Sequence, residues 1–156
     1  MPAINTTSEI FKINSPIQDV YALLSDFNKI GRLFEMAKKM GMANSMQLDK
    51  ISEKIEGTRF TEDACYVQVK GMGEIAVKLI EKEEPKLIKL GGDGGIPVEF
   101  NLWIQLLENG PYDTRLKLTL HAEMNLMMKM MLKGKLEKGI NQFAEGLTKI
   151  PYSMLK

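Results

Sequence analysis

The sequence predicts an α+β protein built from one strand, two short helices, six antiparallel strands and a long C-terminal helix. Between about residues 51 and 124, apolar side chains recur with a period of two, as they do in half-buried strands. Residues 125–150 carry them at intervals of three and four, as on one face of a helix. The chain has 156 residues, the size of one domain, and we expect residues 1–156 to form a single domain.

The N-terminal part of the chain is expected to hold the first strand and both short helices. Residues 7–14 alternate loosely and predict the strand. Ser15 can cap the helix that follows, and Gln18 would complete a capping box with it. Ser25-Asp26 ends this helix and begins a second one, which Gly41 is expected to end.

The middle of the chain divides at its turn signals into six strands. We expect them at residues 51–62, 65–69, 75–79, 87–90, 98–106 and 116–124. Asn109-Gly110 predicts the hairpin between the last two. The last strand alternates strictly between apolar and polar residues, so one of its faces is expected to be buried and the other solvated.

The final helix is expected to begin after Asn125, which can cap it, and to end before Pro151. One stripe of apolar residues, spaced by three and four, predicts the face that packs on the sheet. The stripe consists of Leu132, Leu136, Ile140, Phe143, Leu147 and Ile150.

Composition excludes several classes of function. Twenty-one Lys and Arg residues balance twenty Asp and Glu, whereas a nucleic-acid-binding protein normally has a basic excess. One cysteine and one histidine are too few for an intrachain disulfide or a four-ligand zinc site. No apolar run is long enough to span a bilayer, and the start lacks the pattern of a signal peptide, so we expect a cytoplasmic protein.

The residues also offer little for catalysis or cofactor binding, and we expect no cofactor and no metal. Residues 91–95 are rich in glycine but lead into Ile96-Pro97 rather than the Gly-Lys-Ser/Thr of a phosphate-binding loop, and a mobile hairpin is expected there. His121 falls on the polar face of its strand, and Cys65 shares a face with Val67, which favours a buried, inert thiol. We therefore name no catalytic residue.

The order of the elements resembles the START-like helix-grip superfamily (SRPBCC), which includes polyketide cyclases, lipid-transfer domains and the birch pollen allergen. Residues 61–73 (TEDACYVQVKGMG) and 15–26 (SPIQDVYALLSD) are similar to a small bacterial branch of it. The resemblance implies a strongly curved seven-stranded antiparallel sheet wrapped on the long C-terminal helix. It also implies a cavity for a small hydrophobic molecule such as a lipid, a quinone or a polyketide-like compound.

Methionines gather at one end of this expected fold. In an antiparallel meander, the 41–47 connection, the turns 71–73 and 91–97 and the start of the last helix share one end. Nine of the twelve methionines lie in or beside these four segments. Methionine is flexible and polarizable, and it lines adaptable binding surfaces as well as filling cores. We therefore interpret this end as the mouth of the cavity.

The expected ligand-binding residues are the core-facing side chains nearest that mouth. They are Val69, Met72, Ile75, Leu90, Phe100, Leu102, Leu118, Leu120, Met124, Met128, Met131 and Leu132. Met127, Met128, Met130 and Met131 spread over about 160° of the last helix, largely beyond its apolar stripe, so some of them must face outward. The outward ones would need a lid, a partner subunit or a membrane surface.

Three functions remain open at this point. The first is binding or transport of a small hydrophobic ligand. The second is a cyclase- or aromatase-type enzyme acting on such a molecule, which would need polar groups that converge inside the cavity. The third is an interaction module whose methionine-rich end docks a protein partner or a second copy of the chain.

Overall fold

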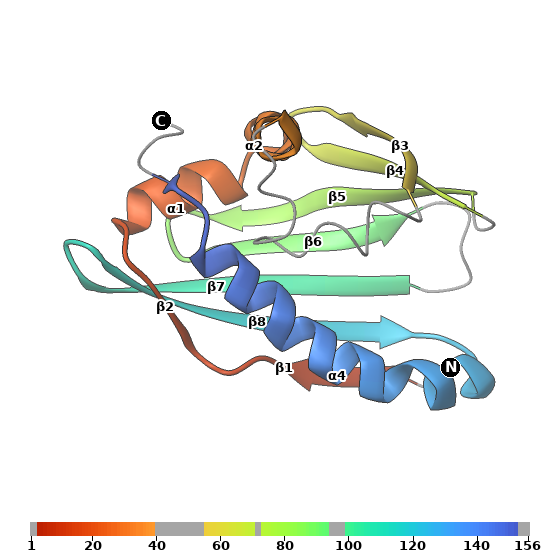
Figure 1. The fold of residues 1–156 in the computed structure, drawn as a ribbon. Coiled ribbons are helices and arrows are strands. Elements are labelled where there is room, and N and C mark those ends of the chain that lie inside the picture. Colours follow the sequence, from red (N-terminus) through yellow and green to blue (C-terminus); the bar gives the residue numbers. More distant parts are fainter. Residues whose placement is uncertain (1–2, 40–54, 71–72, 94–98, 153–156) are drawn as a thin grey trace.

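The computed structural model describes residues 3–39, 55–70, 73–93 and 99–152 (Figure 1). Its strands are β1 (Ala3–Thr7), β2 (Phe11–Ile13), β3 (Ile55–Phe60), β4 (Ala64–Val69), β5 (Gly73–Glu83), β6 (Leu87–Asp93), β7 (Glu99–Gly110) and β8 (Asp113–Glu123). Its helices are α1 (Ile17–Leu24), α2 (Phe27–Lys39) and α4 (Leu126–Thr148).

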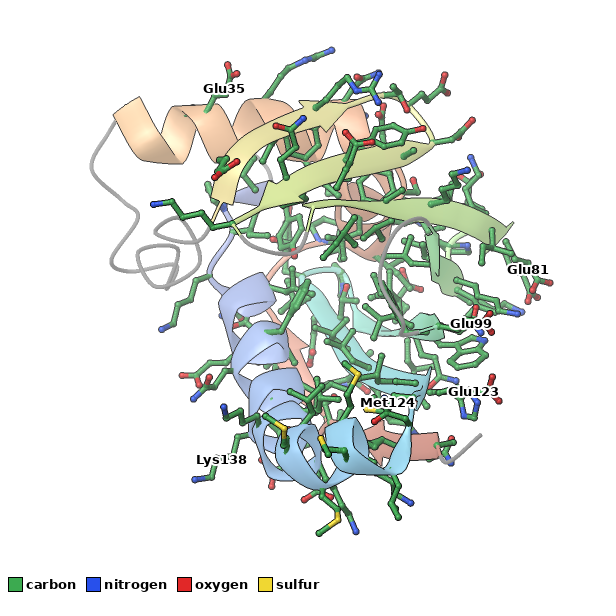
Figure 2. All side chains as sticks on the ribbon, turned by 90° about the vertical axis from the view of Figure 1, so that its right-hand side faces the viewer. Glu35, Glu81, Glu99, Glu123, Met124 and Lys138 are labelled. Atoms are coloured by element: carbon green, nitrogen blue, oxygen red, sulfur yellow. The ribbon has the colours of Figure 1, made fainter. Side chains whose placement is uncertain are left out.

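All the strands belong to one antiparallel sheet in the order β1-β8-β7-β6-β5-β4-β3, and β2 also pairs with β8. Helix α4 packs across β1, β2 and β8, and α1 and α2 lie together at one end of the sheet (Figure 1). In Figure 2 the sheet curves from β3 at the top to β1 at the bottom, with α4 on its inner side. The predicted α+β fold class is confirmed.

One strand was expected at residues 7–14, but the structure has two: β1 begins earlier, at Ala3, and β2 covers only Phe11–Ile13. Ser8 separates them, because its side chain takes part in the ladder with β8. The Ser8 backbone N–H donates to the Leu118 carbonyl (2.8 Å), and the Ser8 Oγ accepts from the Leu118 N–H (2.9 Å). Ile10 then lies 65% exposed before β2 resumes pairing with Phe11 opposite Leu116.

The helix ends agree with the expected capping in two of three places. Asn125 caps α4, since its Oδ1 accepts from the N–H of Met128 (2.8 Å). Asp26 begins α2 through its Oδ1, which accepts from the N–H of Asn28 (2.9 Å). The capping box at Ser15 is wrong: Pro16 is the N-cap of α1 and no side chain caps it. The Ser15 carbonyl instead accepts from the Thr114 hydroxyl (2.8 Å). The expected stop at Gly41 lies outside the described residues.

The buried face of α4 follows the predicted stripe except at Phe143. Ile140 and Leu147 are buried, as expected, but Phe143 is 50% exposed and Ala144 is fully buried. The buried line therefore runs through Ala144, one residue further round the helix. A methyl group at this point lets the helix approach the sheet closely, which a phenyl ring would prevent.

Two glycines allow a direct test of the helix packing. A Cβ atom added to Gly134 in α4 would meet nothing within 4 Å. Gly134→Ala is therefore expected to raise the free energy of unfolding by about 0.5–1 kcal/mol, because alanine is the better helix former. Urea unfolding monitored by circular dichroism measures the shift in midpoint.

Gly31→Ala in α2 is the matched comparison. Its Cβ would lie 2.7 Å from Cδ2 and 2.8 Å from Cγ of the Phe60 ring in β3. Displacing that ring costs about 1–3 kcal/mol, which is expected to exceed the gain in helix propensity. A stabilisation at Gly31 equal to that at Gly134 would contradict the packing of α2 on β3.

Candidate ligand-binding site

The strand register brings the described parts of the expected mouth to one end of the sheet, whereas the 41–47 connection lies outside the described residues. Glu123, at the end of β8, pairs with Ala3 at the start of β1 and with Glu99 at the start of β7. At the same end, Gly73 opens β5 opposite Val69 of β4. Helix α4 begins directly after β8, so its first turns lie here too. We call this the α4-start end.

The buried side chains form two separate clusters. The larger one contains residues of α1, α2, the second half of α4 and the middle of the sheet. The smaller one lies at the α4-start end and consists of Ile4, Ala122 and Met124, with four partly buried neighbours. The interior is therefore closely packed at the α1–α2 end and has far fewer buried groups at the α4-start end.

The boundary between the clusters is a seam of inward-facing apolar residues that remain partly exposed. On β7 and β8 it lies between the register pair Leu102–Leu120, which packs on the larger cluster, and the pair Phe100–Ala122, which packs on the smaller one. On α4 it lies between Leu136 and Ile140. We define the seam as Phe100, Leu102, Leu120, Met128, Leu132 and Leu136, all of which are half-buried.

Partial exposure of the seam is informative because these residues occupy inward positions. Leu118 and Ala122, which flank Leu120 on the same face of β8, are 0% and 2% exposed. Leu120 itself is only half-buried, although strand alternation directs it to the same side. Helix α4 faces this part of the sheet with Met128 and Leu132, which are half-buried as well. Apolar surface on both sides thus remains incompletely covered.

The structure brings most of the sequence-predicted ligand residues to these clusters. Leu90 and Leu118 are buried in the larger cluster, and Met124 is buried in the smaller one, beside the seam (Figure 2). Phe100, Leu102, Leu120, Met128 and Leu132 belong to the seam, and Ile75 is half-buried on β5.

The remaining three predicted residues do not join this group. Met131 was expected to line the cavity, but its side chain is 65% exposed in the structure. The position of the Val69 side chain and the whole of Met72 lie outside the described part of the chain. Leu136 belongs to the seam but was not among the predicted site residues, although it stands four residues after Leu132 on the same stripe.

Gly91 and Gly92 do not form the mobile hairpin expected for residues 91–95; both lie within β6. They give space to larger neighbours on opposite faces of the sheet. A side chain at Gly92 would collide with the Phe100 ring, and one at Gly91 would collide with the end of Ile80. Gly92 therefore lets the Phe100 ring lie against the inner face, at the edge of the seam. Residues 94 and 95 are outside the described ranges.

Polar groups on the inner side are engaged in structural hydrogen bonds. The buried Thr114 hydroxyl donates to the Ser15 carbonyl, and the buried Ser8 hydroxyl donates to the Glu9 carbonyl (2.8 Å each). Burial raises the pKa of the Cys65 thiol to about 11, so it is protonated at neutral pH. Among the described residues, no three His, Cys, Asp or Glu side chains are grouped so as to hold a metal ion.

His121 lies on the outer face of the sheet, as its place in the alternation predicts. Its Nδ1 is 2.5 Å from Asn5 Oδ1, and its Nε2 is 3.6 Å from Glu123 Oε1. With Asn5, Trp103, Gln105 and Thr119 it lines an open hollow of about 380 Å³. This hollow is on the opposite side of the sheet from the seam, so His121 cannot act on a molecule held there.

Comparisons with known proteins establish the fold. No protein-family model matches the chain, and no curated protein matches it. A START superfamily protein from Mycobacterium smegmatis is similar in structure, with a TM-score of 0.64 and 13% identity, and the match covers 99% of each chain. None of the helices in the described residues is long and apolar enough to cross a bilayer.

Two further solved structures show the same architecture. A conserved protein from Geobacillus kaustophilus matches with a TM-score of 0.61 and 16% identity, over 94% of this chain and 93% of its own. Norcoclaurine synthase from Thalictrum flavum matches with a TM-score of 0.61 and 11% identity, over 96% and 94%. The structural neighbours are START-like helix-grip proteins, as the sequence predicted, and this chain has their fold.

The raised pKa of Cys65 predicts slow alkylation. With a pKa of about 11 rather than 9.0, the thiolate fraction at pH 8 is about a hundredfold lower than for an ordinary thiol. The rate of iodoacetamide labelling should therefore reach half its maximum near pH 11 in the folded protein and near pH 9 in denaturant.

The same shift has a consequence for stability. As the pH rises from 9.0 to about 11, the unfolded thiol ionises before the folded one, so the free energy of unfolding should fall. A Cys65→Ala variant, which has no thiol to ionise, should lack this part of the decline. Cys65 is half-buried, and rapid labelling of the folded protein at pH 8 would show that this burial does not raise its pKa.

Proposed function

We propose that this protein binds a small hydrophobic molecule between the inner face of the sheet and the first half of α4. The observation that carries the proposal is the half-buried seam, where inward-facing apolar side chains from β7, β8 and α4 lack full cover. Such a surface gains free energy when an apolar molecule displaces water from it. A lipid, a quinone or a polyketide-like compound has the required chemistry, and the cytoplasm is the expected compartment.

Hydrophobic burial alone is sufficient for useful affinity. Each buried methylene contributes about 0.8 kcal/mol, so eight of them contribute about 6 kcal/mol before the costs of association. Before those costs this corresponds to a dissociation constant of about 40 μM without polar recognition, and a ligand with more buried methylenes would bind more tightly. The expected result is a carrier with broad preference, in which Met128 and neighbouring flexible side chains adapt to the occupant.

The cyclase-type enzyme has less support than binding. It needs at least two polar groups that converge on the substrate. The seam is apolar throughout. The hydroxyl of Ser8 donates to a backbone carbonyl, and so does that of Thr114, which lies toward the other end of β8. Norcoclaurine synthase, by its name an enzyme, shares the fold, but at 11% identity this similarity does not extend to activity.

Filling the seam should abolish ligand binding. Leu120→Trp places a large ring among Leu102, Phe100 and α4, and we expect at least a tenfold weaker uptake of the apolar fluorophore N-phenyl-1-naphthylamine. Met128→Trp fills the same space from the helix side. It replaces Leu120→Trp in the test if that variant folds poorly. Fluorescence titration gives the affinity, and circular dichroism checks the fold.

Tyr112→Trp is the matched control, because Tyr112 lies in the turn between β7 and β8 with its side chain 71% exposed. This variant should bind the fluorophore as the unaltered protein does. Native mass spectrometry of freshly purified protein, with organic extraction, would identify any retained ligand and its class. Equal uptake by all three variants, or none by the unaltered protein, would overturn the proposal.

A further inference from the structure

The first turns of α4 expose more apolar surface than a solvated helix normally does. Leu126, Met127, Met130 and Met131 are 62%, 73%, 77% and 65% exposed. We call these four residues the methionine patch. Contiguous apolar surface of this kind marks a contact with another molecule or with a membrane.

The methionine patch lies on the side of α4 that faces away from the sheet. At 100° per residue its four members fall within an arc of about 140°, and the inward-facing Leu132 and Leu136 lie outside that arc. Figure 2 shows the sulfur atoms gathered around the first turns of α4, at the end where Met124 lies. These turns therefore have an inner apolar side on the seam and an outer apolar side that nothing in the described chain covers.

Lysines lie beside the patch on α4. Between Met124 and Leu136 the only charged residues are Lys129, Lys133 and Lys135, and the last two are exposed. The next residue, Glu137, is exposed on the side of the helix that carries the patch, so the lysines leave a net positive charge there. The partial positive charge of the helix N-terminus has the same sign. The nearest acidic residues on β7 and β8, Glu99 and Glu123, are on the opposite side of the sheet from α4 (Figure 2).

We infer that the methionine patch and its lysines form a docking surface for an anionic lipid bilayer. A helix with apolar residues on one arc and lysines at its margins lies in the interfacial layer, where apolar burial and attraction to anionic headgroups add together. A second copy fits less well, since a symmetric pairing would bring the lysines of both copies together.

Docking would place the seam beside a source of its ligand. Met128 and Leu132 belong to the seam, and they occupy the same turns as Met127, Met130 and Met131. A hydrophobic molecule could then pass between bilayer and protein without crossing water. Transfer of a ligand from the bilayer rests on the proposed ligand-binding function, whereas docking itself does not require a ligand.

The test is co-sedimentation of the full chain, without added ligand, with vesicles of phosphatidylcholine alone or mixed with phosphatidylglycerol. We expect binding to the mixed vesicles that weakens in high salt. Met127→Glu with Met130→Glu should lower the partition coefficient at least about tenfold, because it removes apolar contact and repels anionic headgroups. Lys133→Gln with Lys135→Gln should lower it by about fivefold for each lysine.

Leu107→Glu is the control, since Leu107 is 66% exposed on a different element and should leave vesicle binding unchanged. Absence of binding to mixed vesicles in low salt, or equal binding by the Met127→Glu, Met130→Glu variant, would overturn the inference. So would concentration-dependent dimers in sedimentation velocity that this variant abolishes, because they would assign the patch to a second copy.

The two proposals can fail separately. Uptake of N-phenyl-1-naphthylamine is measured without vesicles, and vesicle binding is measured without the fluorophore. The Met127→Glu, Met130→Glu variant should keep its affinity for the fluorophore, because these side chains point away from the seam. Loss of fluorophore uptake in the unaltered protein, with vesicle binding retained, would refute only the ligand-binding function.

Discussion

The long antiparallel pair of β7 and β8 sets the geometry of the whole protein. At about 3.3 Å per residue, strands of this length extend for about 35–40 Å. On its other edge β8 pairs with β1 and β2, and it leads through the Asn125 cap directly into α4. A strand pair this long runs past the larger buried cluster. The smaller cluster closes the far end, and the seam lies between them.

Much of this fold could be predicted from residue spacing, because β8 and several other strands of the meander alternate clearly. The hairpin expected at Asn109-Gly110 is displaced, since both residues belong to β7 and the turn is made by Pro111 and Tyr112. The β1–β2 interruption could not be predicted, since it depends on one hydroxyl: Ser8 replaces a backbone partner in the ladder with β8. Phe143 and Ala144 show a second limit. Spacing alone favoured the larger apolar residue, while the close approach of helix to sheet selects the smaller one.

The candidate site was predictable in position but less so in the burial of each residue. Register follows from alternation, so the sequence alone assigns the mouth segments to one end. The first turns of α4 are apolar all round, however, and such a pattern does not fix which side faces the sheet. Met128 therefore reached the seam while Met131 became exposed. The packing role of Gly92 could not be predicted from the sequence, because it depends on the Phe100 ring, which occupies the space that a side chain at Gly92 would need.

The small size of the cluster around Ile4, Ala122 and Met124 gives the two ends of the molecule unequal cooperativity. Three buried side chains protect the ladder between β1 and the end of β8, whereas the opposite end rests on the much larger cluster. Backbone amides at the α4-start end should therefore exchange with deuterium through local opening, and those of β6 and the middle of β8 only through global unfolding. A bound molecule would slow exchange at one end and leave the other unchanged.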